Sequence, residues 1–318
     1  MLVITVCTVR QLPQAFALGN TIRHHPNAQF QIGLADELPS AITSPFPYAL
    51  LPVAEVLDAG QLSELSARYT PTEFVAAVKP TLIRAIMARQ TGVESVLYFD
   101  PNTVVYESLT PVPDALRTAN ALLTPHLVAP PADACFPDEK YLQNVGLYSS
   151  DFIALRPGPE TDRMLAWWED RVQTRAQVDF CESLCLDQLW LMHWPALFDG
   201  VRVVQDRSWH RAIWNWHEWP TNAPKSPLWI NFKGLFNPDE GLFAYQNRTL
   251  LARRPDLARL LEAYRQTVAN YTNAVFSQLP AFGKQPEPPI VRGWRRKTGL
   301  FLRSMTRFVD TVQLPTVK

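Results

Sequence analysis

The 318-residue chain has little cysteine, little glycine and no excess of either charge. Its cysteines (Cys7, Cys135, Cys181 and Cys185) form no Cys-x-x-Cys clusters, and Cys181 and Cys185 have the spacing of neighbours on a helix. We therefore predict buried, reduced thiols instead of a disulfide framework or a zinc site. With 30 basic and 30 acidic residues the formal net charge is zero, which argues against a nucleic-acid-binding protein, so any charged partner must be met locally.

Long hydrophobic runs are also lacking. No stretch of the sequence approaches the roughly 18 apolar residues that a membrane-spanning helix needs. The opening segment, MLVITVCTVRQ, has no basic region before its apolar run and no small-residue cleavage signal. We interpret it as a first strand and not as a signal peptide, and we predict a cytoplasmic protein.

Strand-like and helix-like segments alternate over about the first 215 residues. Residues 2–9 are a nearly continuous apolar run, residues 12–25 repeat apolar side chains at helical spacing, and residues 28–36 again resemble a strand. This order predicts an α/β fold with a mainly parallel sheet flanked by helices. Because 47% of the residues are hydrophobic, the chain can bury one large core or two modest ones.

One segment carries a clear signal for the start of a helix. Thr70 can cap the helix, and Glu73 follows three residues later, as in a capping box. Pro80 lacks an N–H and restricts the residue before it, so it should break or kink the helix after Lys79. We expect a second helical piece over residues 81–90.

Residues 96–99 are apolar and lead directly into the turn Asp100-Pro101-Asn102. Both faces of this run are apolar, as expected for a central strand that is covered by helices on each side. A buried strand that delivers a carboxylate into a turn is a common way for an α/β fold to hold a phosphate-bound metal. Asn102 stands where a second carboxylate is expected, which would weaken such a site.

The last part of the chain, residues 276–318, differs in composition. It opens with a proline-rich linker and continues as a basic amphipathic segment. Two interpretations remain open: a helix docked on the main domain with its arginines in water, or a helix that lies on a membrane surface. The apolar members are Trp294, Leu300, Phe301, Leu302, Met305 and Phe308, and the basic members are Arg295, Arg296, Lys297, Arg303 and Arg307.

Four stretches follow one another along the chain: residues 73–109, 146–157, 185–218 and 230–234. Together they resemble successive blocks of glycosyltransferases with the GT-A fold, close to the family-eight type, and their order and spacing match over roughly residues 1–240. The resemblance implies a GT-A-like domain, which we place at residues 1–275. The C-terminal helical tail would then follow.

Members of this family hold a nucleotide-sugar diphosphate through a divalent cation, Mn²⁺ or Mg²⁺, bound by an Asp-x-Asp turn and a later His. Here the turn is Asp100-Pro101-Asn102, and the later stretch is Asn231-Phe232-Lys233-Gly234. The resemblance therefore implies a weakened metal site at Asp100 and Asn102, because an amide oxygen binds these cations less strongly than a carboxylate does. Lys233 would either supply part of the missing positive charge or be a solvated loop residue.

The resemblance also assigns residues to the donor sugar. Asp187 and Gln188 match the family's acid–amide pair without change, so Asp187 would bind sugar hydroxyls and Gln188 would lie near the anomeric carbon. The alternative is a polar helix start before the apolar run that follows. Ser149 takes the place of a family Asn and Asp151 that of a family Gly, so Asp151 would either bind sugar hydroxyls or block the usual position of the donor.

Four further donor-binding candidates follow from the same match. Lys79 matches a basic residue aimed at the donor, and Thr8, at the end of the first strand, would lie near the nucleotide. His210 replaces a family Asn, and Asn215 belongs to a conserved-looking Trp-Asn pair of the family pattern. Because the family's ligand histidine is absent, His210 is a candidate for its role, although lone histidines are more often structural.

The function implied is transfer of a hexose from a UDP- or GDP-sugar to an acceptor hydroxyl on a carbohydrate, lipid or protein, with retention. One alternative is a relative that binds a nucleotide sugar or glycan without turnover, because five positions of the family motifs are substituted: Asn102, Ser149, Asp151, His210 and Asn231. A sugar-1-phosphate nucleotidyltransferase ranks last, since no glycine-rich loop follows the first strand.

Overall fold

The computed structural model describes residues 1–318 except 39–45, 222, 224, 280 and 312–318. The chain divides into two compact units, Met1–Pro286 and Glu287–Lys318. The boundary predicted between residues 275 and 276 lies before this division. All elements named below belong to the first unit except helix α10 (Gly293–Thr311), which belongs to the second.

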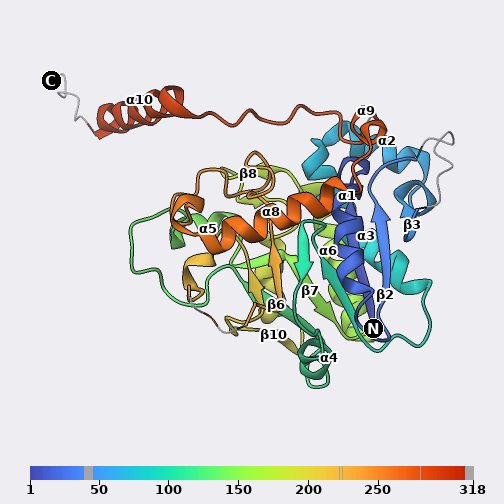
Figure 1. Cartoon of the computed structure of the whole chain (residues 1–318). Coiled ribbons are helices and arrows are strands. Elements are labelled where there is room, and N and C mark those ends of the chain that lie inside the picture. Colours follow the sequence, from blue (N-terminus) through green and yellow to red (C-terminus); the bar gives the residue numbers. More distant parts are fainter. Residues whose placement is uncertain (39–45, 222, 224, 280, 312–318) are drawn as a thin grey trace. The chain divides into compact units, whose positions relative to one another are not determined.

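A seven-stranded sheet forms the centre of the first unit (Figure 1). Every neighbouring pair is parallel except those made by β7, which runs antiparallel to both β4 and β6. The sheet is therefore mainly parallel, as predicted. The strand order is β10 (Val201–Val203), β6 (Ala121–Pro125), β7 (Tyr148–Leu155), β4 (Val96–Phe99), β1 (Leu2–Cys7), β2 (Gln29–Leu34) and β3 (Ala49–Pro52).

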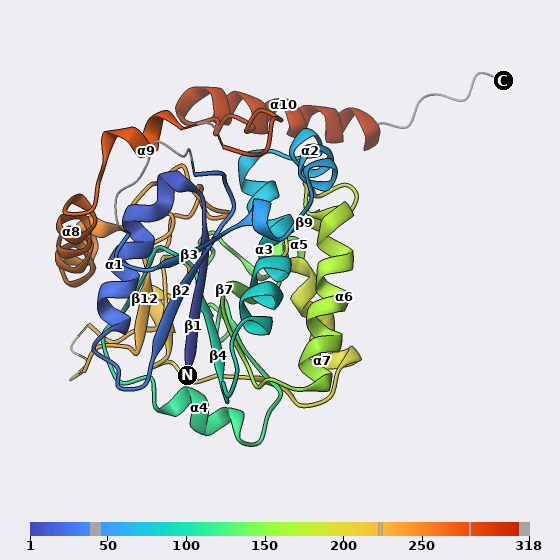
Figure 2. The same ribbon diagram turned by 90° about the vertical axis from the view of Figure 1, so that its right-hand side faces the viewer.

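Helices cover both faces of the sheet (Figure 2). Helix α1 (Leu12–Ile22) packs Leu18 and Ile22 with Leu97 and Phe99 of β4. The opposite face is covered by α3 (Pro71–Ala88) and α6 (Pro159–Arg175). The alternation of side chains along each strand thus feeds two separate cores, which is why the central strands are apolar on both sides.

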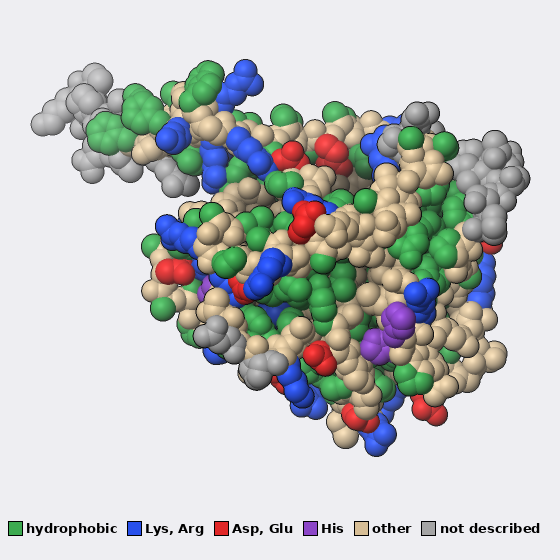
Figure 3. All heavy atoms as spheres, in the orientation of Figure 1, with side chains coloured by type: hydrophobic (Ala, Val, Ile, Leu, Met, Phe, Trp, Pro, Cys, Tyr) green, Lys and Arg blue, Asp and Glu red, His purple; other side chains and the backbone are tan. Residues whose placement is uncertain are grey.

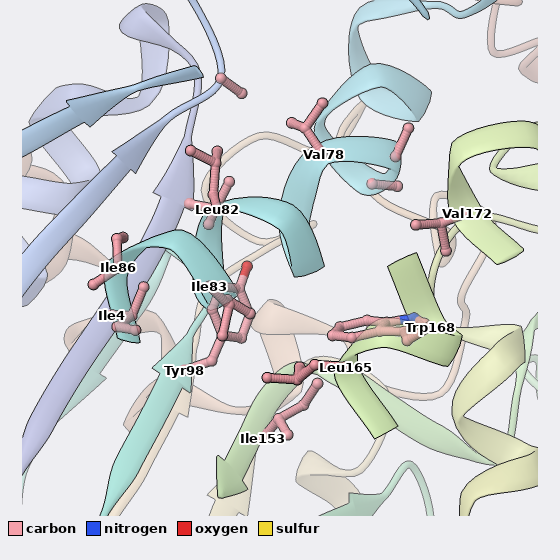
Figure 4. Close-up of a cluster of buried hydrophobic side chains, with 14 of the residues drawn as sticks. Ile4, Val78, Leu82, Ile83, Ile86, Tyr98, Ile153, Leu165, Trp168 and Val172 are labelled. Atoms are coloured by element: carbon pink, nitrogen blue, oxygen red, sulfur yellow. The ribbon is translucent and has the colours of Figure 1, made fainter. Parts of the chain in front are cut away.

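The predicted break at Pro80 is wrong, because α3 continues through this residue. The capping box of Thr70 and Glu73 is present as expected. A proline inside a helix costs about 3 kcal/mol. This cost is offset by burial, because Figure 4 shows Leu82 and Ile83 of α3 among core side chains from β4 and α6, and each fully buried side chain of this size contributes about 1.5–3 kcal/mol.

The cysteines follow the prediction only in part. All four are free, and Cys7 and Cys185 are buried, but Cys181 is exposed and Cys135 is half-buried. Cys181 and Cys185 do not share a helix: they lie in the turn and second strand of the hairpin formed by β8 (Val178–Asp179) and β9 (Leu184–Cys185). Their spacing reflects this hairpin, whose tip carries Cys181 into solvent.

A second, three-stranded sheet of β11 (His210–Arg211), β12 (Trp229–Asn231) and β5 (Thr103–Val105) lies next to the site described below. Over the described residues, no helix has both the length and the hydrophobicity that crossing a membrane requires. The remaining elements are η1 (Val9–Gln11), η2 (Val53–Glu55), α2 (Ala59–Arg68), α4 (Pro111–Leu116), α5 (Glu139–Val145), η3 (Leu189–His193), α7 (Trp194–Leu197), η4 (Trp216–Glu218), η5 (Leu251–Arg253), α8 (Pro255–Ala269) and α9 (Ala274–Gln278).

Candidate active site

The candidate residues meet at one edge of the large sheet. Strands β1 and β4 are parallel, so the residues that follow them, Thr8 and Asp100, lie at the same edge. Strand β7 is antiparallel to β4 and begins at this edge, which brings Asp151 beside Asp100. The backbone N–H of Asp100 donates to the carbonyl oxygen of Asp151 at 2.8 Å.

The small sheet brings the stretch Asn231-Phe232-Lys233-Gly234 to the turn Asp100-Pro101-Asn102. Strand β12 pairs antiparallel with β5, which follows the turn, so Asn231 stands opposite Thr103. The N–H of Phe232 then donates to the carbonyl oxygen of Asn102 at 2.8 Å. This pairing places the next residue, Lys233, over the carboxylates.

Lys233 lies between two carboxylates. Its Nζ is 3.1 Å from Oδ2 of Asp100 and 3.0 Å from Oδ1 of Asp151. Burial alone would lower the pKa of Lys233, but the charges of Asp100, Asp151 and Glu240 outweigh it and hold the pKa well above its ordinary value. The ammonium is therefore charged, and Lys233 is not a solvated loop residue.

The residues that correspond to the family's metal ligands do not fit a divalent cation. Oδ1 of Asp100 accepts from the backbone and side-chain nitrogens of Asn102 (2.9 and 3.2 Å), and Oδ2 accepts from Lys233. Oδ1 of Asn102 accepts from the hydroxyl of Tyr264 (3.4 Å), and Oδ1 of Asn231 from the N–H of Lys233 (2.7 Å). In the described part of the chain no cluster of three His, Cys, Asp or Glu residues could hold a metal ion. A cation would have to displace the ammonium and break these bonds.

Lys79 and Asp187 form a second buried ion pair. Nζ of Lys79 lies 2.6 Å from Oδ2 of Asp187, with side chains 6% and 3% exposed. The hydroxyl of Ser150 lies 3.3 Å from this ammonium and donates to Oδ1 of Asp187 at 3.4 Å. We expected Lys79 to face the donor, but its charge is already matched inside the protein, and its contact fixes the orientation of the Asp187 carboxylate.

Gln188 is held by the end of α5 and by β7. Its Nε2 donates to the carbonyl of Val145 at 2.7 Å, and its Oε1 accepts from the N–H of Ser150 at 3.3 Å. Gly146 has a φ of +107°, and a Cβ there would stand 3.2 Å from Cγ and from the carbonyl oxygen of Gln188. The amide is therefore fixed from two sides, in a space that only glycine leaves free.

His126 was not found from the sequence. It follows β6, and its Nδ1 lies 2.9 Å from the carbonyl of Gly146, so Nδ1 carries the proton. Burial lowers the pKa of His126 to about 4, which keeps the imidazole neutral. Its position directly after an apolar run was the only signal in the sequence, and a lone histidine there is not distinctive.

Three of the predicted donor-binding residues are hydrogen-bonded to other groups of the protein. His210, whose pKa burial lowers to about 3, has Nδ1 at 2.8 Å from Oγ1 of Thr124. Asn215 accepts from the N–H of Ala212 (2.9 Å) and donates to the carbonyl of His210 (3.2 Å). Oγ of Ser149 accepts from the N–H of Asp151 at 3.2 Å. His210 thus links β11 to β6, Asn215 shapes the turn after β11, and Ser149 supports the position of Asp151.

Gln11 and Glu240 belong to the site, and the sequence did not indicate either. Oε1 of Glu240 accepts from Nε2 of Gln11 at 2.7 Å and from Nδ2 of Asn102 at 3.3 Å. The N–H and hydroxyl of Thr8 are bonded to Oε1 of Gln11 at 3.2 and 3.3 Å. Thr8, Gln11, Lys233 and Glu240 are half-buried and form the rim, whereas the deeper Asp100, Asp151, Asp187 and Gln188 are at most 5% exposed.

Comparison with solved structures identifies the fold. The galactosyltransferase LgtC, solved in complex with donor and acceptor sugar analogues, superposes with a TM-score of 0.51 over 86% of this chain and 97% of its own, at 12% identity. The apo form of the glycosyltransferase GlyE of Streptococcus pneumoniae TIGR4 gives 0.49 over 87% of this chain and 62% of its own, also at 12% identity. No protein-family profile matches the sequence, and no curated protein matches it. The similarity to LgtC confirms the predicted GT-A-like glycosyltransferase fold.

The geometry at Gly146 gives a first prediction. Gly146→Ala should lower the free energy of unfolding by about 1–3 kcal/mol, because an alanine is strained at this positive φ and its Cβ presses on Gln188. Gly92→Ala is the matched control, since Gly92 also has a positive φ (+72°) but nothing within 4 Å of the added Cβ. Urea denaturation of both variants compares the two costs. Equal losses would show that the contact with Gln188 is unimportant.

Proposed function

We propose that the protein is a hexosyltransferase that moves a sugar from a UDP- or GDP-sugar to a hydroxyl of a carbohydrate, lipid or protein acceptor, with retention at the anomeric carbon. The observation that carries the proposal is the ammonium of Lys233 between Asp100 and Asp151, while Ser150, the residue before Asp151, is bonded to both Asp187 and Gln188. In this proposal the fixed positive charge stabilises the negative charge of the leaving diphosphate, and the polar pair binds the sugar.

The roles of the residues follow from their positions. Asp187, oriented by Lys79, binds hydroxyls of the donor sugar, and the fixed amide of Gln188 lies close to the anomeric carbon. Asp151 and Asp100 hold Lys233 in place, and Lys233 stabilises the diphosphate as the glycosidic bond breaks. Thr8, at the rim after β1, lies on the nucleotide side. The protein residues thus supply the positive charge that a divalent cation supplies in relatives.

The alternative function is binding of a nucleotide sugar or glycan without turnover. It is favoured by the substitution of both expected metal ligands by Asn102 and Asn231, whose oxygens are bonded to Tyr264 and to the backbone of Lys233. Saturation-transfer NMR with UDP- and GDP-hexoses, beside an assay of donor hydrolysis, separates the two. Binding with slow hydrolysis supports the enzyme, whereas binding with no hydrolysis supports the alternative.

A second prediction concerns Asp187. Asp187→Asn should lower donor hydrolysis about 100-fold, because the carboxylate that binds sugar hydroxyls loses its charge. Asp187→Asn and Asp187→Ala both remove the negative charge beside Lys79, but Asn keeps an oxygen that accepts from the ammonium, so we expect it to cost less stability than the about 3–5 kcal/mol expected for Ala. Asp199→Asn, at an exposed carboxylate, is the control. Unchanged hydrolysis in a folded Asp187→Asn protein would remove Asp187 from the active site.

A third prediction concerns the source of positive charge. Lys233→Ala should weaken binding of UDP-sugars and GDP-sugars at least about tenfold, since a charge-assisted contact contributes about 1.5–3 kcal/mol, while EDTA should have little effect on the wild type. Lys225→Ala, at an exposed lysine, is the control. Calorimetric titration of the nucleotide sugar, with and without EDTA or Mn²⁺, measures both effects. Strong dependence on Mn²⁺ beside an unaffected Lys233→Ala variant would contradict this role.

We further propose that α10 binds the inner face of a membrane peripherally, which places the enzyme in the cytoplasm near a membrane-linked acceptor. Along this helix Trp294, Phe301, Leu302, Met305 and Phe308 share one face by their spacing, whereas Arg296 and Arg303 lie on the other. Figure 3 shows hydrophobic and basic side chains along this helix. Such a helix matches an anionic lipid surface.

This gives a fourth prediction. The full chain should float with vesicles of anionic lipid, and a chain ending at Pro288 should not. Vesicles of zwitterionic lipid are the control, because the basic side chains contribute only at a negative surface. Equal flotation of the two chains with anionic vesicles would favour a helix docked on the protein instead.

A further inference from the structure

We propose that Gln11, Asn102 and Lys233 form an anion site for the diphosphate of the donor, and that the carboxylate of Glu240 occupies this site in the free protein. The inference rests on the proposed function, because it names what displaces Glu240. It concerns the rim of the site, where Gln11, Lys233 and Glu240 are half-buried.

The first support is the set of donors around one carboxylate. Nε2 of Gln11 and Nδ2 of Asn102 both donate to Oε1 of Glu240, at 2.7 and 3.3 Å. The ammonium of Lys233 also acts on Glu240 electrostatically. These groups come from three separate parts of the chain, after β1, after β4 and after β12. Neutral amide N–H groups and an ammonium are the groups that bind phosphate oxygens in proteins.

The second support is the way in which Glu240 and its neighbours cover the site. Gly241 has a φ of +86°, and a Cβ there would lie 3.4–3.6 Å from the methylene carbons of Lys233. The carbonyl of Leu242 accepts a hydrogen bond from the hydroxyl of Tyr141. Segment 240–243, which is neither helix nor strand, thus lies over Lys233. A diphosphate that binds Gln11, Asn102 and Lys233 would have to displace Glu240 from this position.

The third support is the balance of charge. Lys233 carries one positive charge, whereas Asp100, Asp151 and Glu240 carry three negative charges when ionised, and Lys79 and Asp187 cancel each other. The carboxylate of Asp100 repels that of Glu240, whose hydrogen-bond partners Gln11 and Asn102 are neutral amides. An incoming diphosphate is repelled as long as Glu240 remains. If Glu240 leaves, one negative charge is removed and the donors it held become free for phosphate oxygens.

A purely structural Glu240 predicts the opposite outcome for a simple substitution. Glu240→Gln keeps the acceptor oxygen for Gln11 and Asn102 but removes the negative charge. If Glu240 serves stability through its charge, Glu240→Gln lowers the midpoint of thermal unfolding. If Glu240 is a displaceable anion, this midpoint is unchanged or higher, because the substitution keeps the acceptor oxygen and removes a charge that Asp100 repels.

The experiment is calorimetric titration with inorganic pyrophosphate, UDP and GDP. Glu240→Gln should bind pyrophosphate and the nucleoside diphosphates about tenfold more tightly than the wild type, because it no longer competes as an anion. Asp239→Asn, at the neighbouring exposed residue, is the matched control and should leave affinity unchanged. Gln11→Leu should weaken binding in the Glu240→Gln background, since it removes one donor.

The outcomes separate this inference from the proposed function. Tighter binding of pyrophosphate by Glu240→Gln, without hydrolysis of any nucleotide sugar, would uphold the anion site and contradict the enzyme. Hydrolysis by the wild type together with equal affinities of wild type and Glu240→Gln would overturn the anion site and leave the enzyme in place. Absence of pyrophosphate and nucleoside-diphosphate binding in every variant, or equal gains in Asp239→Asn and Glu240→Gln, would also overturn it.

Discussion

The site depends on the ion pairs of the Lys233 ammonium with Asp100 and Asp151. Asp100 and Asp151 lie on adjacent strands, are joined by a backbone hydrogen bond and are each 5% exposed. Two buried carboxylates this close to each other, both in contact with one ammonium, cannot both stay ionised without a compensating charge. Lys233 supplies it, and the pairing of β12 with β5 positions Lys233. The small sheet is therefore part of the electrostatics of the site, because without its register the two acids at the edge of the large sheet would have no counter-ion.

The need for a compensating charge also applies to the more deeply buried residues of the site. Lys79 and Asp187 are buried together, and removal of either would leave an uncompensated charge. A buried ion pair contributes little net stability, but it restricts its members to one geometry. The pair fixes Asp187, and the carbonyl of Val145 and the N–H of Ser150 fix Gln188. Thus Asp187 and Gln188 are both positioned before any ligand arrives, whereas Glu240 is held by the neutral amides of Gln11 and Asn102.

Much of this arrangement could be predicted from the sequence, and the part that could not has a physical reason. The first βαβ unit, the strand at residues 96–99 and the turn at Asp100 follow from local patterns, and the family resemblance indicated Asp151, Asp187 and Lys233. The break at Pro80 was wrong because tertiary packing outweighs a local preference. Gln11, His126 and Glu240 carry no motif, and their roles come from contacts between distant segments, such as the bond between Gln11 and Glu240. The ion pair of Lys233 with Asp100 spans 133 residues, so each motif indicated one charge and neither indicated the pair.

An ammonium can stabilise a diphosphate in place of a divalent cation, but it does so more effectively in a closed site than in contact with water. Lys233 carries one charge, and two carboxylates already share it, so in a solvated cleft it would add little to the stability of a leaving diphosphate. Coulomb energies rise as the effective dielectric constant falls, from about 1 kcal/mol at 4 Å in water to about 4 kcal/mol at an effective constant near 20. The proposed role of Lys233 therefore requires that water be excluded from around the diphosphate. Segment 240–243, whose Gly241 lies against the methylene carbons of Lys233, is placed to contribute to that exclusion once Glu240 has been displaced. In this proposal the lysine and the segment belong together, because a single positive charge stabilises the diphosphate enough only where water is kept out.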